Sequence, residues 1–189
     1  MKFISIALAL AAAALGRGEN TVKLVSQDSV DRTVHFTGNP GMPAIETVTV
    51  RGHQNVTVDM PHGWIGNWFA VSRGAAVAPG MLGEVAFNSW GGVTFFDVSA
   101  IVNAHDHVGV KKMWPAASRK PSSGCDAFPC AFAYYLPDDV QTQATRETDL
   151  ICTLGGGGDA RNAAPVVDAA TALVFPREFV TGRGLPVQI

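Results

Sequence analysis

The chain has 189 residues, of which 47% are hydrophobic and 16% are charged, and its formal net charge is −2. This length suits one ordinary domain with a buried core, and this composition excludes a wholly disordered chain. A phosphate backbone is held mainly by lysine and arginine, so the absence of net positive charge argues against a nucleic-acid partner.

Residues 1–16 have the pattern of a secretory signal peptide. The segment MKFISIALALAAAALG contains one lysine, a short alanine-rich apolar run and small residues near its end. We expect the mature chain to begin near residue 17. No later stretch approaches the roughly 20 apolar residues that a membrane helix needs. The sequence therefore predicts a protein secreted to the extracellular space or the cell wall, without a membrane partner.

Short runs rich in Val, Thr, Phe and Trp follow one another at strand length, separated by Gly, Pro, Asn and Asp. They cover residues 21–26, 32–37, 45–50, 54–59, 64–71, 82–88, 93–99 and 148–154. Residues 45–50 and 54–59 alternate apolar and polar side chains around Arg51-Gly52-His53, which predicts a hairpin. We therefore predict an all-β fold, an antiparallel β-sandwich over residues 17–154.

Residues 155–189 have a different character. Four consecutive glycines open this segment, and Ala, Pro and Gly recur through it without clear alternation. We expect a loosely attached or disordered tail, with a short helix around residues 166–174 as one option.

Acidic residues are the first candidates for a site. Glu84 and Asp97 lie on neighbouring predicted strands, Asp106 follows in the next connection, and Asp138-Asp139 come after a proline. Two carboxylates that face one cleft suit a glycoside hydrolase, and they equally suit a site that only binds sugar hydroxyls or a cation. The alternative is a set of scattered surface acids.

Two tryptophans and two histidines extend the list of candidates. Trp64 and Trp90 each lie beside a glycine turn, where a partly exposed ring can stack on a sugar. His105 and His107 alternate around Asp106 and could share a metal if a third ligand came from Glu84 or Asp97. We favour a solvated loop there and assign no metal or other cofactor.

Covalent features follow from an extracellular location. Asn55 opens an Asn-Val-Thr glycosylation sequon. Cys125, Cys130 and Cys152 predict one disulfide and one remaining thiol, and the spacing alone leaves all three pairings open.

The stretch LGEVAFN at residues 82–88, followed by FDVS at 96–99, resembles the thaumatin-like family. The C-x4-C spacing of Cys125 and Cys130 and the run AYYLPDD at residues 133–139 extend the likeness to residues 20–154. It is similar to the family's small secreted fungal branch, which lacks the disulfide-rich second domain.

The resemblance implies a β-sandwich with an acidic cleft that binds β-1,3-glucan. Carried over by position, Glu84, Asp97, Asp138 and Asp139 match the family's acids. The family's cleft arginine falls near Ala70 and is therefore missing, unless Arg73 substitutes for it. The family also has an aspartate a few residues after its D-I-S motif. In this chain Val102 or Asn103 replaces it, and Asp106 could serve only if the loop has shifted.

The family's pairing also implies a disulfide between Cys125 and Cys152, with Cys130 a buried thiol.

These observations predict a monomer that binds cell-wall β-glucan through Glu84, Asp97, Asp106, Asp138, Asp139, Trp64 and Trp90. One alternative is a weak endo-β-1,3-glucanase, with Glu84 as acid and Asp97 as base or nucleophile. A second is a secreted effector or interaction protein that meets a host or wall protein. The most distant is a metal-dependent nuclease that uses His105, Asp106 and His107.

Overall fold

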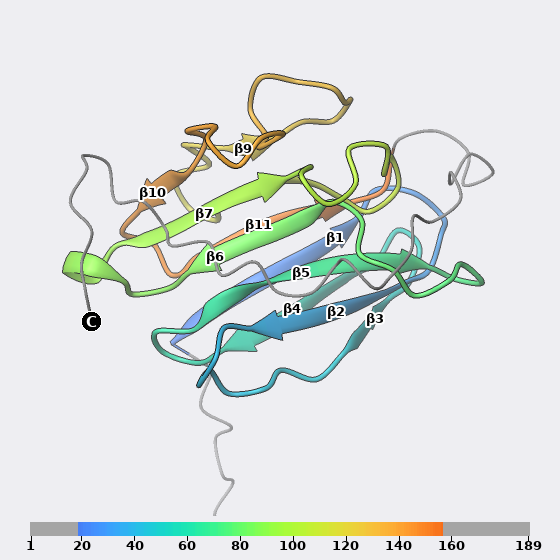
Figure 1. The fold of residues 1–189 in the computed structure, drawn as a ribbon. Helices are drawn as coiled ribbons and strands as arrows, with labels where there is room; N and C mark the ends of the chain where they lie inside the picture. The colour runs from blue at the N-terminus through green and yellow to red at the C-terminus, as the bar shows by residue number, and fades with distance from the viewer. Residues whose placement is uncertain (1–18, 157–189) are drawn as a thin grey trace, which may run out of the picture.

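The computed structural model describes residues 19–156, which form a β-sandwich of two layers (Figure 1). Sheet A has the strand order β4-β1-β11-β8-β9, and sheet B has the order β10-β7-β6-β5-β2-β3. This confirms the predicted all-β class. The predicted signal peptide at residues 1–16, the start of the mature chain and the tail beyond Gly156 lie outside the described residues.

The strands keep the predicted order along the chain. Sheet A contains β1 (Asn20–Ser26), β4 (Asn55–Met60), β8 (Val110–Pro115), β9 (Ser123–Gly124) and β11 (Asp149–Leu154). Sheet B contains β2 (Arg32–Gly38), β3 (Val48–Val50), β5 (Ile65–Ser72), β6 (Leu82–Ala86), β7 (Thr94–Ser99) and β10 (Gln143–Thr145). A 3-10 turn, η1 (Trp90–Gly92), joins β6 to β7.

One strand pair departs from the antiparallel prediction. β1 and β11 run parallel, from Thr21 opposite Asp149 to Ser26 opposite Leu154. Parallel neighbours cannot be joined by a tight turn, and here almost the whole described domain separates the two strands in sequence. The first and last strands of the sandwich thus meet inside sheet A.

The core lies between the two sheets and is filled from alternate positions of each strand. Its largest fully buried apolar side chains are those of Trp64, Trp68, Phe87 and Phe96. Gly83 on β6 leaves space for the Trp68 indole, because a Cβ at Gly83 would lie 2.5 Å from that ring. The core thus takes one face of each sheet.

The predicted hairpin of residues 45–50 and 54–59 is wrong. β3 pairs with β2 in sheet B, whereas β4 pairs with β1 in sheet A. The turn between them is a corner that passes from one layer to the other. Neighbouring loops hold this corner, since the Gly52 N–H donates to Asp31 Oδ1 at 2.9 Å and the His53 N–H donates to the Asp28 carbonyl at 2.8 Å.

The ordered domain continues past the predicted boundary at Leu154. The Gly155 N–H donates to the Gly109 carbonyl at 3.0 Å, and the Gly156 N–H donates to Asp28 Oδ2 at 2.9 Å. Both glycines have positive φ, and a Cβ at Gly155 would meet the Asp28 and Arg32 side chains. These two residues therefore belong to the folded domain.

Candidate functional site

Glu84 and Asp97 are direct neighbours across β6 and β7. Val85, Phe96 and Val98, which alternate with them, are fully buried in the core, so both carboxylates lie on the outer face of sheet B. Residues opposite each other in an antiparallel pair have Cβ atoms about 5 Å apart. The two carboxylates therefore lie side by side on one face of sheet B.

These two carboxylates are nevertheless poorly accessible. Glu84 is 8% exposed and Asp97 is 2% exposed, and the Thr142 hydroxyl donates to Asp97 Oδ2 at 3.4 Å. A cleft that works on a polysaccharide needs acids that solvent and sugar can reach. The expected open cleft with these two acids as its walls is therefore not what the structure shows.

The other acids lie in separate loops. The Asp106 carboxylate accepts from the N–H groups of Met81, Val108 and Gly109 at 2.8–2.9 Å. The Asp139 carboxylate accepts from Tyr135 and Leu136 N–H groups at 2.8 and 2.9 Å in the same way. Both acids have a local structural role that their sequence spacing did not indicate, and Asp138 is exposed.

The two candidate histidines do not form the expected extended pair. His105 lies in a turn, and the His105 N–H donates to Asn103 Oδ1 at 3.0 Å. Within residues 19–156, no group of three or more His, Cys, Asp or Glu side chains could hold a metal ion. The geometry needed for a metal centre at His105 and His107 is thus not assembled there.

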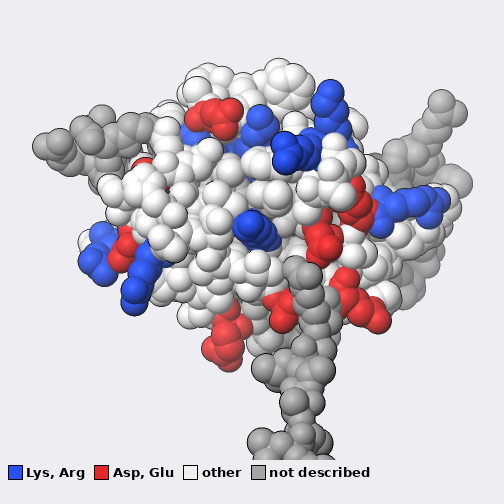
Figure 2. Space-filling view, turned by 180° about the vertical axis from the view of Figure 1, so that it is seen from behind, with Lys and Arg blue, Asp and Glu red and all other residues white. Residues whose placement is uncertain are grey.

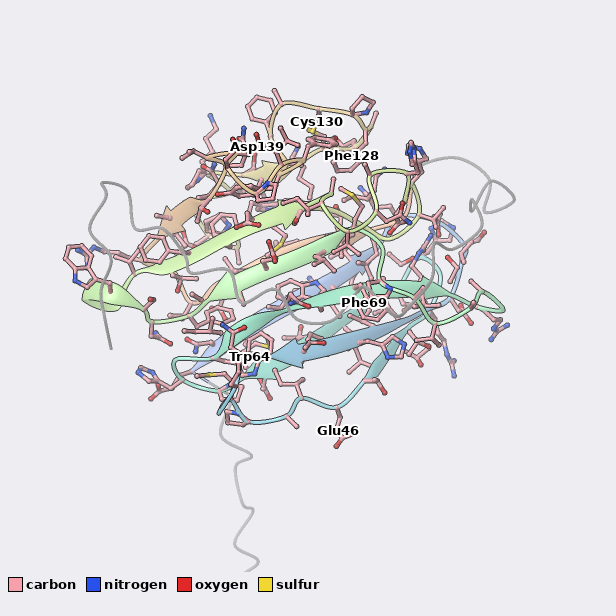
Figure 3. All side chains as sticks on the ribbon, in the orientation of Figure 1. Glu46, Trp64, Phe69, Phe128, Cys130 and Asp139 are labelled. Carbon is pink, nitrogen blue, oxygen red and sulfur yellow. A yellow bond between two sulfur atoms is a disulfide. The ribbon has the colours of Figure 1, made fainter. Side chains whose placement is uncertain are left out.

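The two candidate tryptophans differ in exposure. Trp90 on η1 is 77% exposed, as predicted. The prediction for Trp64 is wrong, because this side chain is fully buried and its Nε1–H donates to the Pro43 carbonyl at 3.0 Å. The Trp64 ring also lies against Gly66, where a Cβ would come within 2.6 Å of it. Trp64 directly precedes β5, and Figure 3 labels it beside the start of that strand.

The predicted disulfide between Cys125 and Cys152 is also wrong. Cys125 is bonded to Cys130, and Cys152 on β11 is a fully buried thiol. Cys152 lies opposite Met113 of β8, inside sheet A and among core side chains, whereas Cys125 lies in the loop that follows β9. Burial raises the pKa of the Cys152 thiol to about 12.

Cys125 of this disulfide lines a groove that the sequence did not reveal. The groove has a volume of about 980 Å³. Its walls include Lys112 from β8, Gly124 from β9, Gln143 from β10, and Lys120 and Phe132 from loops. Cys125, which lines the groove, is bonded to Cys130, and Figure 3 labels Cys130 at the top of the view. No motif joins these wall residues, because they come from four separate stretches of the chain.

Exposed apolar side chains lie along one wall of this groove and beyond it. Among the described residues, the large hydrophobic side chains with high exposure are Val77, Trp90, Phe132, Leu136 and Val140. The last three belong to residues 131–143, a segment we call the groove loop, and they are 62%, 58% and 89% exposed. Exposed apolar side chains that gather in one segment indicate a contact surface.

The groove loop is held firmly at its base. The Gly124 N–H and the Ser123 hydroxyl both donate to the Phe132 carbonyl, at 2.6 and 3.1 Å. The buried Ser123 hydroxyl in turn accepts from the Val98 N–H at 2.9 Å. Because this chain of bonds links sheet A to sheet B, the exposed Phe132 side chain stands on a fixed backbone.

The buried Lys111 side chain contacts the loop that the disulfide closes, residues 125–130. The Lys111 ammonium lies 4.9 Å from the Phe128 ring centroid and donates to the His107 carbonyl at 3.4 Å. Burial lowers the pKa of Lys111, while the charges of Asp106 and Asp126 act in the opposite direction. The lysine thus ties the loop of residues 125–130 to the Asp106 loop.

Comparison with known proteins gives a close relative. The chain is 62% identical over 130 residues to the antigenic protein SchS21 of Stachybotrys chartarum, and the match covers 69% of this chain and 90% of that protein. The chain belongs to the SchS21 family. No family model matches it.

A solved structure supports the fold of this SchS21 family member. The crystal structure of the protein elicitor MoHrip2 from Magnaporthe oryzae superposes with a TM-score of 0.53 at 13% identity, covering 72% of this chain and 98% of that one. At this identity the likeness concerns the fold alone. The resemblance to the thaumatin-like family stays a prediction.

Proposed function

We propose that the protein is secreted and acts by binding another protein through its groove loop. The observation that carries the proposal is the exposure of Phe132, Leu136 and Val140 on one anchored segment. A few side chains carry most of the affinity of a protein interface, and aromatic side chains such as that of Phe132 are enriched at interfaces. A relative described as antigenic and a fold shared with a protein elicitor agree with an extracellular interaction protein.

The rigidity of the loop adds to this argument. A side chain on a mobile loop loses conformational entropy on binding, whereas the backbone of Phe132 is already fixed by Ser123 and Gly124. The poor accessibility of Glu84 and Asp97 further favours binding by the loop over binding by an open acidic cleft on sheet B.

The test uses the full secreted chain and two matched variants. One variant carries Phe132→Ser, Leu136→Ser and Val140→Ser, and the other carries Trp90→Ser and Val77→Ser, which change exposed apolar side chains elsewhere. Proteins captured from host extracellular fluid are quantified by mass spectrometry. We expect a partner that is retained by wild type and by the second variant and lost with the first. Equal capture by all three proteins would contradict the proposal.

Secretion needs its own experiment. Within residues 19–156 there is no helix long and apolar enough to cross a membrane. We expect the chain expressed with residues 1–16 in a fungal host to accumulate in the medium, and the chain without residues 2–16 to stay in the cells.

Binding of β-glucan is the second candidate, and the cross-strand pairing of Glu84 with Asp97 favours it. If these acids contact the polysaccharide, Glu84→Gln combined with Asp97→Asn will abolish retention on insoluble β-1,3-glucan. Release of reducing sugar by the wild type would separate a hydrolase from a binding protein. Retention unchanged by the double substitution would remove this candidate.

A further inference from the structure

We infer that the groove binds an extended, acidic segment of a partner protein, which adds to β10 as a further strand. The inference rests on the proposed function and names the chemistry of the partner. It follows from the edges of the two sheets, from the charges of the lysines and from the position of the Phe132 ring.

The groove lies where both sheets end. β9 is the last strand of sheet A and β10 is the last strand of sheet B, and Gly124 and Gln143 from these strands line the groove. The β9 edge is already occupied, because the Gly124 N–H, on the side away from β8, donates to the Phe132 carbonyl. Its edge therefore offers no room for an added strand.

The β10 edge is different. Within the described part of the chain, β10 pairs with β7 on one side only, from Gln143 opposite Phe96 to Thr145 opposite Thr94. An edge strand of this kind presents backbone N–H and C=O groups that can pair with an extended peptide. The main-chain bonds would supply affinity, and the groove walls would select side chains.

The charges of the walls select acidic side chains. Lys112 and Lys120 face the groove with a single acid, Asp126. Asp126 is already 3.8 Å from the Lys112 ammonium, and Lys120 makes no ion pair within residues 19–156. Figure 2 shows several Lys and Arg side chains on the upper part of the face seen from behind, together with an acidic side chain, and further Lys and Arg side chains at its left and right margins. One uncompensated cation at the groove favours a negatively charged partner.

The remaining walls suit a peptide. The Phe132 ring is 62% exposed and offers an apolar contact for a side chain on one face of an added strand. Gln141 and Gln143 provide amide groups that can bond to a main chain. Amides and an aromatic ring also suit an acidic saccharide, but only a peptide would use the β10 edge.

The test uses two labelled peptides of about 12 residues, an extended length that spans an edge strand and its flanks. One alternates Glu and Val, and the other alternates Lys and Val. Binding to the full secreted chain is followed by fluorescence anisotropy. We expect the acidic peptide to bind and the basic one not to, and added salt to weaken binding. Amide hydrogen exchange should slow at residues 143–145 when the acidic peptide is present.

Matched variants locate the binding. Lys120→Glu should weaken binding of the acidic peptide by about tenfold, whereas Lys23→Glu, an exposed lysine on β1, should leave it within about twofold. Phe132→Ser should weaken it, and Trp90→Ser should not. Equal effects of Lys120→Glu and Lys23→Glu would overturn the inference, as would unchanged exchange at residues 143–145.

An acidic oligosaccharide provides the competing outcome. If oligogalacturonate binds in a Lys120-dependent manner while the acidic peptide does not, the groove is a saccharide site and the inference fails. The proposed function fails separately, when the triple substitution at Phe132, Leu136 and Val140 leaves partner capture unchanged. The opposite case leaves the proposed function standing while the inference fails. If the triple substitution at Phe132, Leu136 and Val140 abolishes partner capture but Lys120→Glu leaves it unchanged, the loop binds a protein and the groove does not bind its acidic strand.

Discussion

Arg32 and Asp28 form a two-point ion pair that ties sheet B to the loops at the end of sheet A. Nη1 lies 2.7 Å from Oδ1 and Nη2 lies 2.7 Å from Oδ2, and the arginine side chain is fully buried. Arg32 Nε–H also donates to the Val108 carbonyl at 2.7 Å. The pair thus connects the start of β2, the loop before β8 and, through Gly156, the end of β11.

Arg32→Met should destabilise the fold strongly. The substitution leaves Asp28 and several backbone groups without their donor, and breaking a buried ion pair costs about 3 kcal/mol of unfolding free energy. Arg73→Met is the matched control, since Arg73 pairs with Asp31 at 2.7 Å but its side chain is 80% exposed. Its cost should be below about 1 kcal/mol. Urea unfolding measures the loss of unfolding free energy in each variant. Equal losses would contradict a structural role for the buried Arg32–Asp28 pair.

The same pair predicts a loss of stability in acid. The hydrogen bond from Arg32 holds the pKa of Asp28 well below its ordinary value, and N–H groups of Gly156 and Val30 act in the same direction. The unfolded pKa is near 3.9, so the stabilisation is fully present above that pH and is lost as the pH falls toward the lower folded pKa. Asp28→Asn should flatten the dependence of unfolding free energy on pH below about 4. A slope identical to that of wild type would assign the acid sensitivity to other groups.

The two kinds of cysteine should behave differently toward thiol reagents. Burial raises the pKa of Cys152 to about 12, so this thiol should not react with a thiol reagent in the folded protein at neutral pH. In the unfolded protein, one thiol per chain should react. Its contribution to stability is fully present below the unfolded pKa of about 8.5 and is lost as the pH rises toward 12. Peptide mapping without reductant should link residues 125 and 130. A linked peptide that contains Cys152 would contradict this assignment.

Removing the disulfide should cost less than removing a long-range one. Cys125 and Cys130 are five residues apart, and closing so short a loop restricts the unfolded chain by about 2 kcal/mol. Cys125→Ser combined with Cys130→Ser should lower the unfolding free energy by about that amount, measured with urea. Because Cys125 lines the groove, the same variant should also bind the acidic peptide more weakly.

Asp106 should behave as a structural residue. Its carboxylate satisfies three backbone N–H groups, so Asp106→Ala should lower the unfolding free energy by about 1–3 kcal/mol. Asp138→Ala, at an exposed acid in another loop, is the control and should change it by less than about 0.5 kcal/mol. A stable Asp106→Ala protein would return this residue to the candidates for ligand binding.

Asn55 should carry a glycan when the chain is secreted by a eukaryotic host. Asn55 and Thr57 are both exposed on β4, the edge strand of sheet A, so the sequon is accessible. Asn55→Gln and Thr57→Ala should each remove the same mass from the intact secreted protein. An unchanged mass would show that the sequon is not used.

The sequence by itself determined the fold class and most of the strands. Alternating apolar positions locate strands because side chains in a strand point to opposite faces, and this rule depends only on local order. The same rule placed Glu84 and Asp97 on one face, because successive strands joined by a short connection commonly pair. A neighbouring glycine turn predicts partial exposure for both Trp64 and Trp90, and this local signal is right for Trp90 and wrong for Trp64.

Only the tertiary structure decided which distant segments meet. β1 pairs in parallel with β11, a strand far away in sequence. The corner at Gly52 and the burial of Trp64 also depend on distant segments, and residues 51–66 carry no local signal for either feature. Cys125 pairs with Cys130 because Cys152 is held within the core on β11. The groove needs the ends of both sheets together with Lys120 and Phe132, and packing of the whole sandwich brings those segments to one place.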